Sequence, residues 1–378
     1  MRPPHSRKTQ ALEYNMPDLD FKPLNREPPL SDLVSSFITT KGGYDRNHGG
    51  IAHIDGSKHH VRVDGAVDSS LELSISQLQN DFPQHTVVCA LQCAGNRRHT
   101  MRTRIKEVQG IDWGDAAVMN CKWRGPRLRD VLNKAKVVLP EPEKGHVAFA
   151  SYAVPCQEDE WYGASIELQR AIDEEADVIL ALEMNGEPLT AEHGFPVRVV
   201  TPGIAGARAV KWLDRITVQV VESPNFYQQH DYKILPPDAV DAETADKYWH
   251  TTPALQTMPV NSVIAIPEPG STVERASDGT VALSGYALPS GEGGPVVKVE
   301  VSGDGEKWIE AQLIHHPDDS KWSWKLWTAN LKVEPGDEVT LYSKATDSAG
   351  FTQEKRSQWN LRGVGYNGYG EASELRIV

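Results

Sequence analysis

Cysteine is scarce in this sequence, and long apolar runs are missing. Only four cysteines occur among 378 residues, too few and too unevenly placed for a disulfide scaffold. We therefore expect a reducing compartment, either the cytoplasm or the matrix of an organelle such as the peroxisome or mitochondrion. No stretch approaches the roughly 20 apolar residues that cross a membrane, and no apolar segment follows the basic N-terminus, so we expect neither a membrane partner nor a secretory signal.

Positive charge is also in short supply. The chain has 39 lysines and arginines against 52 aspartates and glutamates, which gives a formal net charge of −13. This balance argues against a nucleic-acid partner, because a protein must neutralise the phosphates that it binds. An acidic protein that binds an anion must concentrate its cations locally, so clustered arginines are the first candidates for a site.

The chain is long enough for two domains, each able to bury a core of its own. Residues 1–30 are rich in proline and charge and are expected to form an extended arm. Residues 31–253 mix helical and strand patterns. Residues 254–378 contain short alternating apolar runs separated by glycine and aspartate turns, typical of a β-sandwich. Because no cysteine lies beyond residue 156, we expect tryptophans to supply much of this sandwich's core.

Local patterns predict individual elements of the first domain. Ser74 precedes a helix start, and apolar residues at helical spacing between residues 128 and 135 predict a core-facing helix. The alternation that begins at His60 indicates a half-buried strand. Asn185-Gly186 lies between two apolar runs and predicts a tight β-hairpin.

The stretch from Val87 to Arg98 carries the strongest chemical signal. A short apolar run, which indicates a buried strand, ends in Cys93 and breaks at Ala-Gly-Asn. Five cationic side chains and no acid lie between Cys93 and Lys106, and positive charge favours the thiolate, which is both a nucleophile and a soft metal ligand. The alternative is that Cys93 is only a small buried residue; the arginines favour a site near an anion.

Two further segments suggest anion contacts. The glycine-bounded loop at residues 44–49 carries an arginine and a histidine, although most such loops are solvated turns. The block from His193 to Trp212 is a buried strand that runs into a loop with two glycines and two cations. Glycines let backbone N–H groups approach a phosphate, although Gly-x-x-Gly alone is usually structural.

Taken together, five separated segments resemble the sulfite oxidase family, which also includes the molybdenum domain of assimilatory nitrate reductases. They are Tyr-Asp-Arg-Asn-His at 44–48, Leu-Gln-Cys-Ala-Gly-Asn-Arg-Arg at 91–98, the block 193–212, Asp-Tyr-Lys at 231–233 and Trp-Asn-Leu-Arg-Gly at 359–363. The resemblance covers roughly residues 40 to 365. It implies an α+β chain: a mixed α/β molybdopterin domain followed by an immunoglobulin-like sandwich that forms a homodimer.

The same resemblance implies roles for individual residues. The Cys93 sulfur would bind molybdenum. Molybdopterin would be held by Tyr44, Arg46, Asn47, His48, His193, Arg198, Ala209, Val210 and Lys211. The substrate pocket would be formed by Arg46, Arg98, Trp113, Tyr232 and Arg362. Two features depart from the family pattern: Val154 stands where many relatives carry an aspartate, and the tail from Tyr366 differs from their Trp-His-Arg ending.

The implied reaction is oxidation of the small oxoanion sulfite to sulfate. Nitrate-reducing relatives tend to replace the arginine at the position of Arg362, so sulfite is favoured over nitrate. The alternatives are a nitrate reductase-like enzyme, another oxoanion or sulfoxide molybdoenzyme, and a non-enzymatic anion-binding interaction module. About 40 residues precede the first motif, too few for a haem domain, so we expect electrons to pass directly to oxygen or to a separate carrier.

Overall fold

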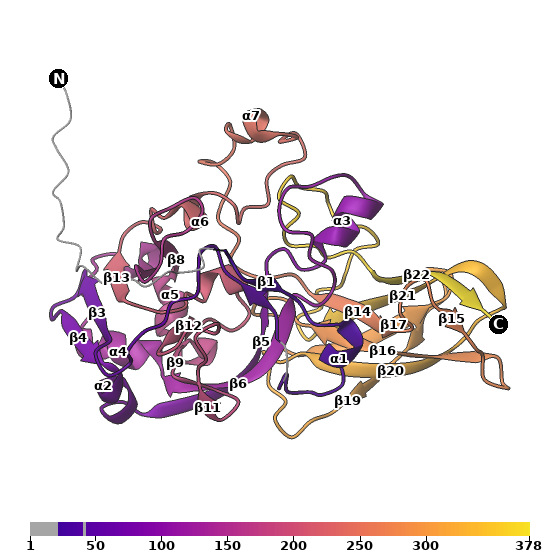
Figure 1. The fold of residues 1–378 in the computed structure, drawn as a ribbon, viewed down its shortest axis with the longest axis horizontal. Coiled ribbons are helices and arrows are strands. Elements are labelled where there is room, and N and C mark those ends of the chain that lie inside the picture. Colours follow the sequence, from indigo (N-terminus) through magenta and orange to yellow (C-terminus); the bar gives the residue numbers. More distant parts are fainter. Residues whose placement is uncertain (1–21, 41–42) are drawn as a thin grey trace.

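The computed structural model describes residues 22–40 and 43–378, so most of the expected arm, residues 1–21, lies outside the described residues. Two β-rich domains lie side by side (Figure 1). In the described part of the chain, no helix is long and apolar enough to cross a membrane.

A five-stranded sheet and two short helices form the main core of the first domain. The strands run in the order β4 (Leu71–Ser74), β3 (His60–Gly65), β13 (Arg215–Gln219), β7 (His146–Ser151) and β8 (Tyr162–Glu167). Only β3 and β13 are parallel. Helices α4 (Leu128–Ala135) and α5 (Leu168–Ile172) bury their apolar faces in this core. The helix predicted after Ser74 is α2 (Ile75–Asn80), which begins with a capping box between Ser74 and Gln77.

A second sheet carries the predicted cysteine strand. Its order is β11 (Glu187–Pro188), β10 (Glu183–Met184), β6 (Val118–Pro126) and β5 (Gln84–Gln92). Asn185 and Gly186 join β10 to β11 with φ values of 57° and 87°, as the predicted hairpin requires.

Short elements complete the first domain. The two-stranded pairs are β1 (Asn25–Arg26) with β2 (Asp45–Arg46), and β9 (Ile179–Ala181) with β12 (Arg198–Val200). The remaining helices are α1 (Leu30–Leu33), α3 (Arg98–Arg104), α6 (Phe226–Gln229) and α7 (Ala242–Ala245), with 3₁₀ turns at Pro142–Lys144, Glu174–Ala176 and Gly206–Arg208. The expected domain boundary at residues 253 and 254 falls between α7 and the first strand of the second domain.

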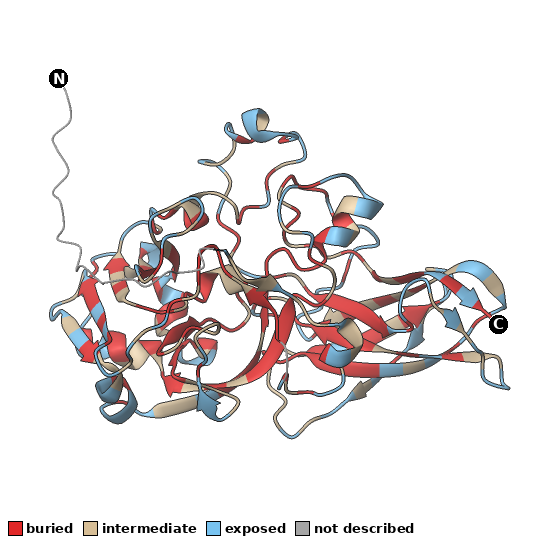
Figure 2. Ribbon diagram, viewed as in Figure 1, coloured by how far each residue is buried: buried red, intermediate tan, exposed pale blue. Residues whose placement is uncertain are grey.

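The second domain is a two-sheet sandwich, which confirms the predicted fold class. One sheet has the order β14 (Asn261–Ile266), β16 (Thr280–Leu288), β20 (Lys325–Lys332) and β19 (Gln312–Ile314). The other has the order β15 (Thr272–Val273), β22 (Gly370–Ile377), β21 (Gly336–Asp347), β17 (Val296–Ser302) and β18 (Ile309–Glu310). Buried positions follow the inner faces of both sheets (Figure 2).

The expectation that tryptophans fill much of the sandwich core is wrong. Valine, leucine and alanine side chains make up most of that core, and Trp327 is its one tryptophan among the described residues. Trp322 and Trp324 pack against the first domain instead: their indole nitrogens donate to Asp177 Oδ2 at 2.9 Å and to the Phe37 carbonyl at 2.8 Å. These two residues lie just before β20, where the chain faces its neighbouring domain.

Arg97 joins the two domains from the loop after β5. This residue has a positive φ of 67° and is 1% exposed. Its guanidinium donates to Asn261 Oδ1 at 2.8 Å and to two carbonyls before β22, at Gly368 (2.8 Å) and Tyr369 (2.7 Å). It also lies 3.4 Å from Asp115 and stacks over the Tyr366 ring at 4.5 Å. The tail that begins at Tyr366 therefore binds the turn after Cys93.

Arg97→Met should lower the free energy of unfolding by about 3 kcal/mol, because it leaves several buried acceptors without a donor. Urea denaturation of the intact chain measures this loss. The matched control is Arg104→Met on α3, whose side chain is 45% exposed and whose loss should cost less than about 1 kcal/mol. Equal losses for the two variants would contradict the structural role of Arg97.

Candidate active site

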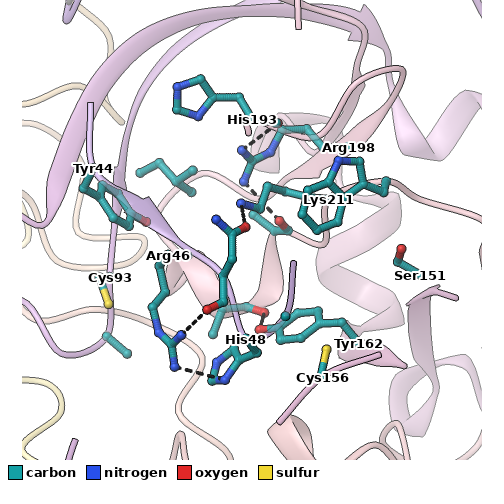
Figure 3. Close-up of a pocket in the computed structure, with 18 of the residues that line it drawn as sticks. Tyr44, Arg46, His48, Cys93, Ser151, Cys156, Tyr162, His193, Arg198 and Lys211 are labelled. Atoms are coloured by element: carbon teal, nitrogen blue, oxygen red, sulfur yellow. Dashed lines mark hydrogen bonds between the residues drawn. The ribbon is translucent and has the colours of Figure 1, made fainter. Parts of the chain in front are cut away.

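A deep cavity in the first domain collects segments that are distant in the sequence. It has an empty volume of about 780 Å³, including the part open to solvent. Its walls come from the loop after β2, the end of β5, the segment between β7 and β8, and the chain on either side of β12. Figure 3 shows Arg46, His48 and Cys93 towards one end, and His193, Arg198 and Lys211 towards the other.

Most of the residues predicted for the site line this cavity: Tyr44, Arg46, Asn47, His48, Cys93, His193, Arg198, Ala209, Lys211 and Tyr232. Four predicted residues do not line it. Arg98, Trp113 and Arg362 lie behind or beside its wall. Val210 packs in the main core, and both of its backbone groups bond within the chain, to Arg208 and Val199.

The alternation of β5 brings Cys93 to the cavity. Leu91 and Cys93 lie two residues apart, so their side chains point to the same face, and both line the cavity. Cys89 shares this face but is buried opposite Cys121 on β6. Burial raises the pKa of Cys121 to about 12 and that of Cys89 further, so these two thiols remain protonated core residues. The four cysteines of the chain are free. Cys93 is buried but lines the cavity, whereas Cys89 is a core residue.

A hydrogen-bonded chain links Arg46, His48 and Tyr232. Arg46 Nη2 lies 3.0 Å from His48 Nδ1, and His48 Nε2 lies 2.6 Å from the Tyr232 hydroxyl. Burial and the Arg46 charge hold the pKa of His48 well below its ordinary value, so the ring is neutral. Because Nδ1 accepts from a guanidinium, the ring proton lies on Nε2 and is donated to Tyr232. Burial raises the pKa of Tyr232 to about 12, so its hydroxyl keeps its own proton to donate into the cavity.

The opposite end of the cavity gathers unneutralised cations. Arg198 donates to the carbonyls of His193 at 3.0 Å and Ala209 at 3.1 Å, while its buried Nε has no partner among the described residues. Burial lowers the pKa of Arg198 to about 10. Burial and the Arg198 charge lower the pKa of Lys211 to about 7, and burial, Arg198 and Lys211 lower that of His193 to about 4.

These cations require an anionic occupant. The described lining contains three cationic side chains and two histidines but no carboxylate, and like charges buried together are costly unless an anion neutralises them. Gly206 permits close approach to this wall, since a Cβ there would lie 2.6 Å from the Tyr44 hydroxyl. A phosphate-bearing group that reaches from Lys211 and Arg198 to the Cys93 thiol fits the donor set. Groups of three or more His, Cys, Asp or Glu side chains that could bind a metal are not found in residues 22–40 and 43–378.

Arg98 and Arg362 form a second cationic group beside the cavity. Arg98 donates to the carbonyls of Arg362 at 3.0 Å and Ile111 at 2.7 Å. Its guanidinium packs so closely on Gly95 that a Cβ there would lie 2.3 Å from Nη2, which explains the glycine after Cys93-Ala94. Arg362 pairs with Asp231 at 2.6 Å. Its charge is therefore partly neutralised.

Trp113 is buried next to this group. It is 3% exposed, meets the Tyr44 ring edge-on at 6.5 Å, and leaves its indole N–H without a partner in the described part of the chain.

Sequence reasoning missed several residues of the cavity wall. Ser151, Cys156, Tyr162 and Trp212 line it, and Tyr162 stacks on His48 with 5.6 Å between ring centroids. Ser151, Cys156 and Tyr162 lie in ordinary strands and loops without a charged or glycine-rich motif, whereas Trp212 ends the block 193–212 but carries no charge itself. Val154 also lines the cavity and packs with Ala52 and Trp212, so an apolar side chain occupies this part of the wall.

Comparison with known proteins identifies the family of both domains. Residues 48–227 match the family model described as the oxidoreductase molybdopterin binding domain, and residues 252–372 match the Mo-co oxidoreductase dimerisation domain. Sulfite oxidase of Gallus gallus is 43% identical over 352 residues, which cover 91% of this chain and 74% of that protein. Sulfite oxidase of Arabidopsis thaliana is 39% identical over 363 residues, covering 91% and 89%. The chain belongs to the sulfite oxidase family.

Two further similarities are limited, one in the length that is covered and the other in sequence identity. The chain spans 62% of the mitochondrial sulfite oxidase of Homo sapiens, to which it is 43% identical. The crystal structure of the sulfane dehydrogenase SoxCD from Paracoccus pantotrophus has a TM-score of 0.73 and covers 97% of this chain and 92% of its own. At 24% identity, this likeness establishes the fold alone.

The molybdopterin domain makes the chain an oxidoreductase with a Mo-molybdopterin cofactor, which excludes a purely non-enzymatic interaction module.

The lowered pKa of Lys211 predicts that anion binding depends on pH. Its charge is about nine-tenths present at pH 6 and about one-tenth at pH 8. Apo-protein, made in a host that does not synthesise the cofactor, should therefore bind sulfate up to about tenfold more tightly at pH 6 than at pH 8. The histidines contribute no charge change in this range, because the pKa of His193 is about 4 and that of His48 is also depressed.

Calorimetric titration of sulfate at both pH values measures this difference. Lys211→Met should bind weakly at both, whereas Lys58→Met, which removes an 81% exposed lysine, should keep the wild-type difference. A wild-type affinity that is independent of pH would contradict the assignment.

Proposed function

We propose that this chain is a molybdenum-dependent sulfite oxidase. The observation that carries the proposal is one cavity with a thiol at one end and three cationic side chains, but no acid, in its described lining. When bound, the molybdenum cofactor supplies a two-electron acceptor and the oxygen atom that converts sulfite to sulfate. The rest of the work is binding, orientation and charge, and it belongs to the protein.

Cofactor binding is assigned to both ends of the cavity. The Cys93 thiolate would be the protein ligand to the metal, since soft sulfur ligands suit such a centre. Arg198, Lys211 and His193 would neutralise the phosphate and bind the pterin. Asn47 positions Lys211, whose ammonium group contacts the Asn47 side-chain oxygen and donates to the Glu192 carbonyl at 2.8 Å.

Substrate binding is assigned to three guanidiniums and two aromatic residues. Arg46, Arg98 and Arg362 would attract the sulfite dianion with forked donors at fixed geometry. The Tyr232 hydroxyl donates a hydrogen bond into the same space, because His48 already supplies a donor to its oxygen. Buried Trp113 would close the pocket and keep water from the reacting atoms.

Cys93→Ser should abolish sulfite oxidation, because a serine hydroxyl is a hard and poorly ionised ligand. A steady-state assay with sulfite and an artificial acceptor measures activity, and metal and pterin analysis shows how much cofactor is bound. Cys89→Ser on the same strand is the control and should retain activity, since that side chain points into the core. Wild-type turnover by molybdenum-loaded Cys93→Ser enzyme would disprove the ligand assignment.

Arg362→Met should lower kcat/KM for sulfite by roughly 10- to 150-fold, mainly through KM. Charge-assisted hydrogen bonds contribute about 1.5–3 kcal/mol, and the variant also leaves the Asp231 carboxylate unpaired beside the dianion. Arg362→Lys should restore part of the loss. Faster reduction of nitrate than oxidation of sulfite by the wild-type enzyme would favour the nitrate reductase-like alternative instead.

We also propose that the sandwich makes the chain a homodimer in a reducing compartment, either the cytoplasm or an organelle matrix. The match to a dimerisation domain and the free thiols support this. Light scattering of the intact chain tests the assembly. A chain truncated before β14 is a poor test, because it exposes the acceptors and aromatic contacts that Arg97 and Trp324 use.

Oxygen is the proposed electron acceptor, as in the haem-free plant-type members that the sequence resembles, with a separate carrier protein as the alternative. Purified enzyme should consume oxygen and form hydrogen peroxide in proportion to sulfate. Peroxide trapping and an oxygen electrode measure both. Turnover that begins only after a carrier protein is added, with peroxide at background, would rule oxygen out.

A further inference from the structure

The segment before the first family motif contacts the active site directly. Strand β1 pairs antiparallel with β2, with Asn25 opposite Arg46 and Arg26 opposite Asp45. The Arg26 guanidinium donates to Asp45 Oδ2 at 2.6 and 3.0 Å, and Asp45 is buried. An extended stretch outside the recognised motifs is therefore fixed against the loop that carries Arg46, Asn47 and His48.

The Asn25 side chain binds this loop at two points. Its Oδ1 accepts from Arg46 Nη1 at 3.1 Å and from the Asn47 backbone N–H at 3.4 Å. The neighbouring Leu24 carbonyl accepts from Asn47 Nδ2 at 3.1 Å. Arg46 and Asn47, which face the substrate and the cofactor, thus share one support.

Asn25 binds one nitrogen of the Arg46 guanidinium and leaves other N–H groups of that guanidinium available. Both protons of Nη1 are used, by Asn25 Oδ1 and by the Asn47 carbonyl, and one proton of Nη2 is used by His48 Nδ1. Within the described residues, no acceptor is found for Nε or for the second Nη2 proton. Nε and Nη2 together form the side edge of a guanidinium, which can bind an oxoanion through two parallel hydrogen bonds.

The same segment also binds the loop that carries Trp113. The Glu27 carboxylate accepts from the backbone N–H groups of Gly114 at 2.7 Å and Ala116 at 3.1 Å. These residues follow Trp113, and the Gly114 carbonyl accepts from the Arg97 N–H at 2.8 Å. Residues 24–27 therefore connect the Arg46 loop to the Trp113 loop.

We propose that Asn25 is a positioning residue for the oxoanion: it holds the Arg46 guanidinium by one edge so that the Nε–Nη2 edge is presented to the substrate. The proposal rests on the proposed function, since it assigns Arg46 to sulfite binding. Asn25 does not contact the substrate itself. Its effect should appear in KM and in anion affinity more than in kcat.

The test compares two substitutions at this position in the holoenzyme. Asn25→Ala removes the acceptor and should raise KM for sulfite and the Kd for sulfate by about tenfold, with kcat within about twofold and with wild-type metal and pterin content. Asn25→Asp keeps an acceptor for both hydrogen bonds but neutralises Arg46, so it should weaken sulfate binding while leaving the melting temperature close to the wild-type value. A merely structural asparagine predicts a lower melting temperature but wild-type KM and Kd for the alanine variant, and that result would overturn the proposal.

A double-mutant cycle shows whether Asn25 acts through Arg46. Asn25→Ala should add little to the loss of sulfate affinity in an Arg46→Gln background, because the group that it positions is already gone. Lys22→Ala, an exposed change in the same segment, is the matched control and should bind sulfate like the wild type. Fully additive losses from Asn25→Ala and Arg46→Gln would overturn the proposal.

Sulfate calorimetry separates this proposal from the proposed function. An enzyme that does not oxidise sulfite, but whose sulfate affinity shows non-additive losses for Asn25→Ala and Arg46→Gln, would disprove the proposed function and support the positioning role. An enzyme that oxidises sulfite with a sulfate Kd indifferent to Asn25→Ala would support the function and overturn the positioning role.

Discussion

The burial of several cations around one cavity is the constraint on which the rest of this structure depends. Arg46, Arg198 and Lys211 are held by backbone carbonyls and amide oxygens, which orient a positive charge without neutralising it. Neutral partners leave the positive potential directed into the cavity, whereas carboxylates would cancel it. Burial and the Arg198 charge lower the pKa of Lys211, which reflects the cost of holding these cations close together. A charged, preorganised cavity of this kind favours an anionic guest over water.

In the turn after β5, some residues lie at or beside the cavity and others bind the second domain. Cys93 faces the cavity, and Arg98 lies against Gly95 beside it. Asn96 and Arg97, between them, point the other way and bind the sandwich, where the Asn96 amide donates to the Tyr286 hydroxyl at 3.1 Å. The positive φ of Arg97 makes this division possible, because it reverses the chain within a single residue. The six consecutive residues from Cys93 to Arg98 thereby serve two domains.

The sequence was sufficient for those parts of the molecule that local chemistry specifies. The strand of Cys93, the capped helix after Ser74, the Asn-Gly hairpin and the sandwich follow from periodicity and turn residues, and the site motifs carry unusual charge or glycine content. Tyr162 and Cys156 could not be found this way, because they reach the cavity only through the packing of strands. The same limit explains Trp322 and Trp324, whose burial depends on a neighbouring domain, and Asn25, whose role depends on a partner 21 residues away.

The position of Arg97 has a consequence for how far the two domains can be separated. Its partners Gly368 and Tyr369 belong to the tail of the second domain, and Tyr366 covers its guanidinium. Removal or replacement of this tail would leave the arginine without these acceptors and disturb the turn that carries Cys93 and Arg98. The second domain is thus not an interchangeable module. The turn that carries Cys93 is completed only when the tail of the sandwich is in place.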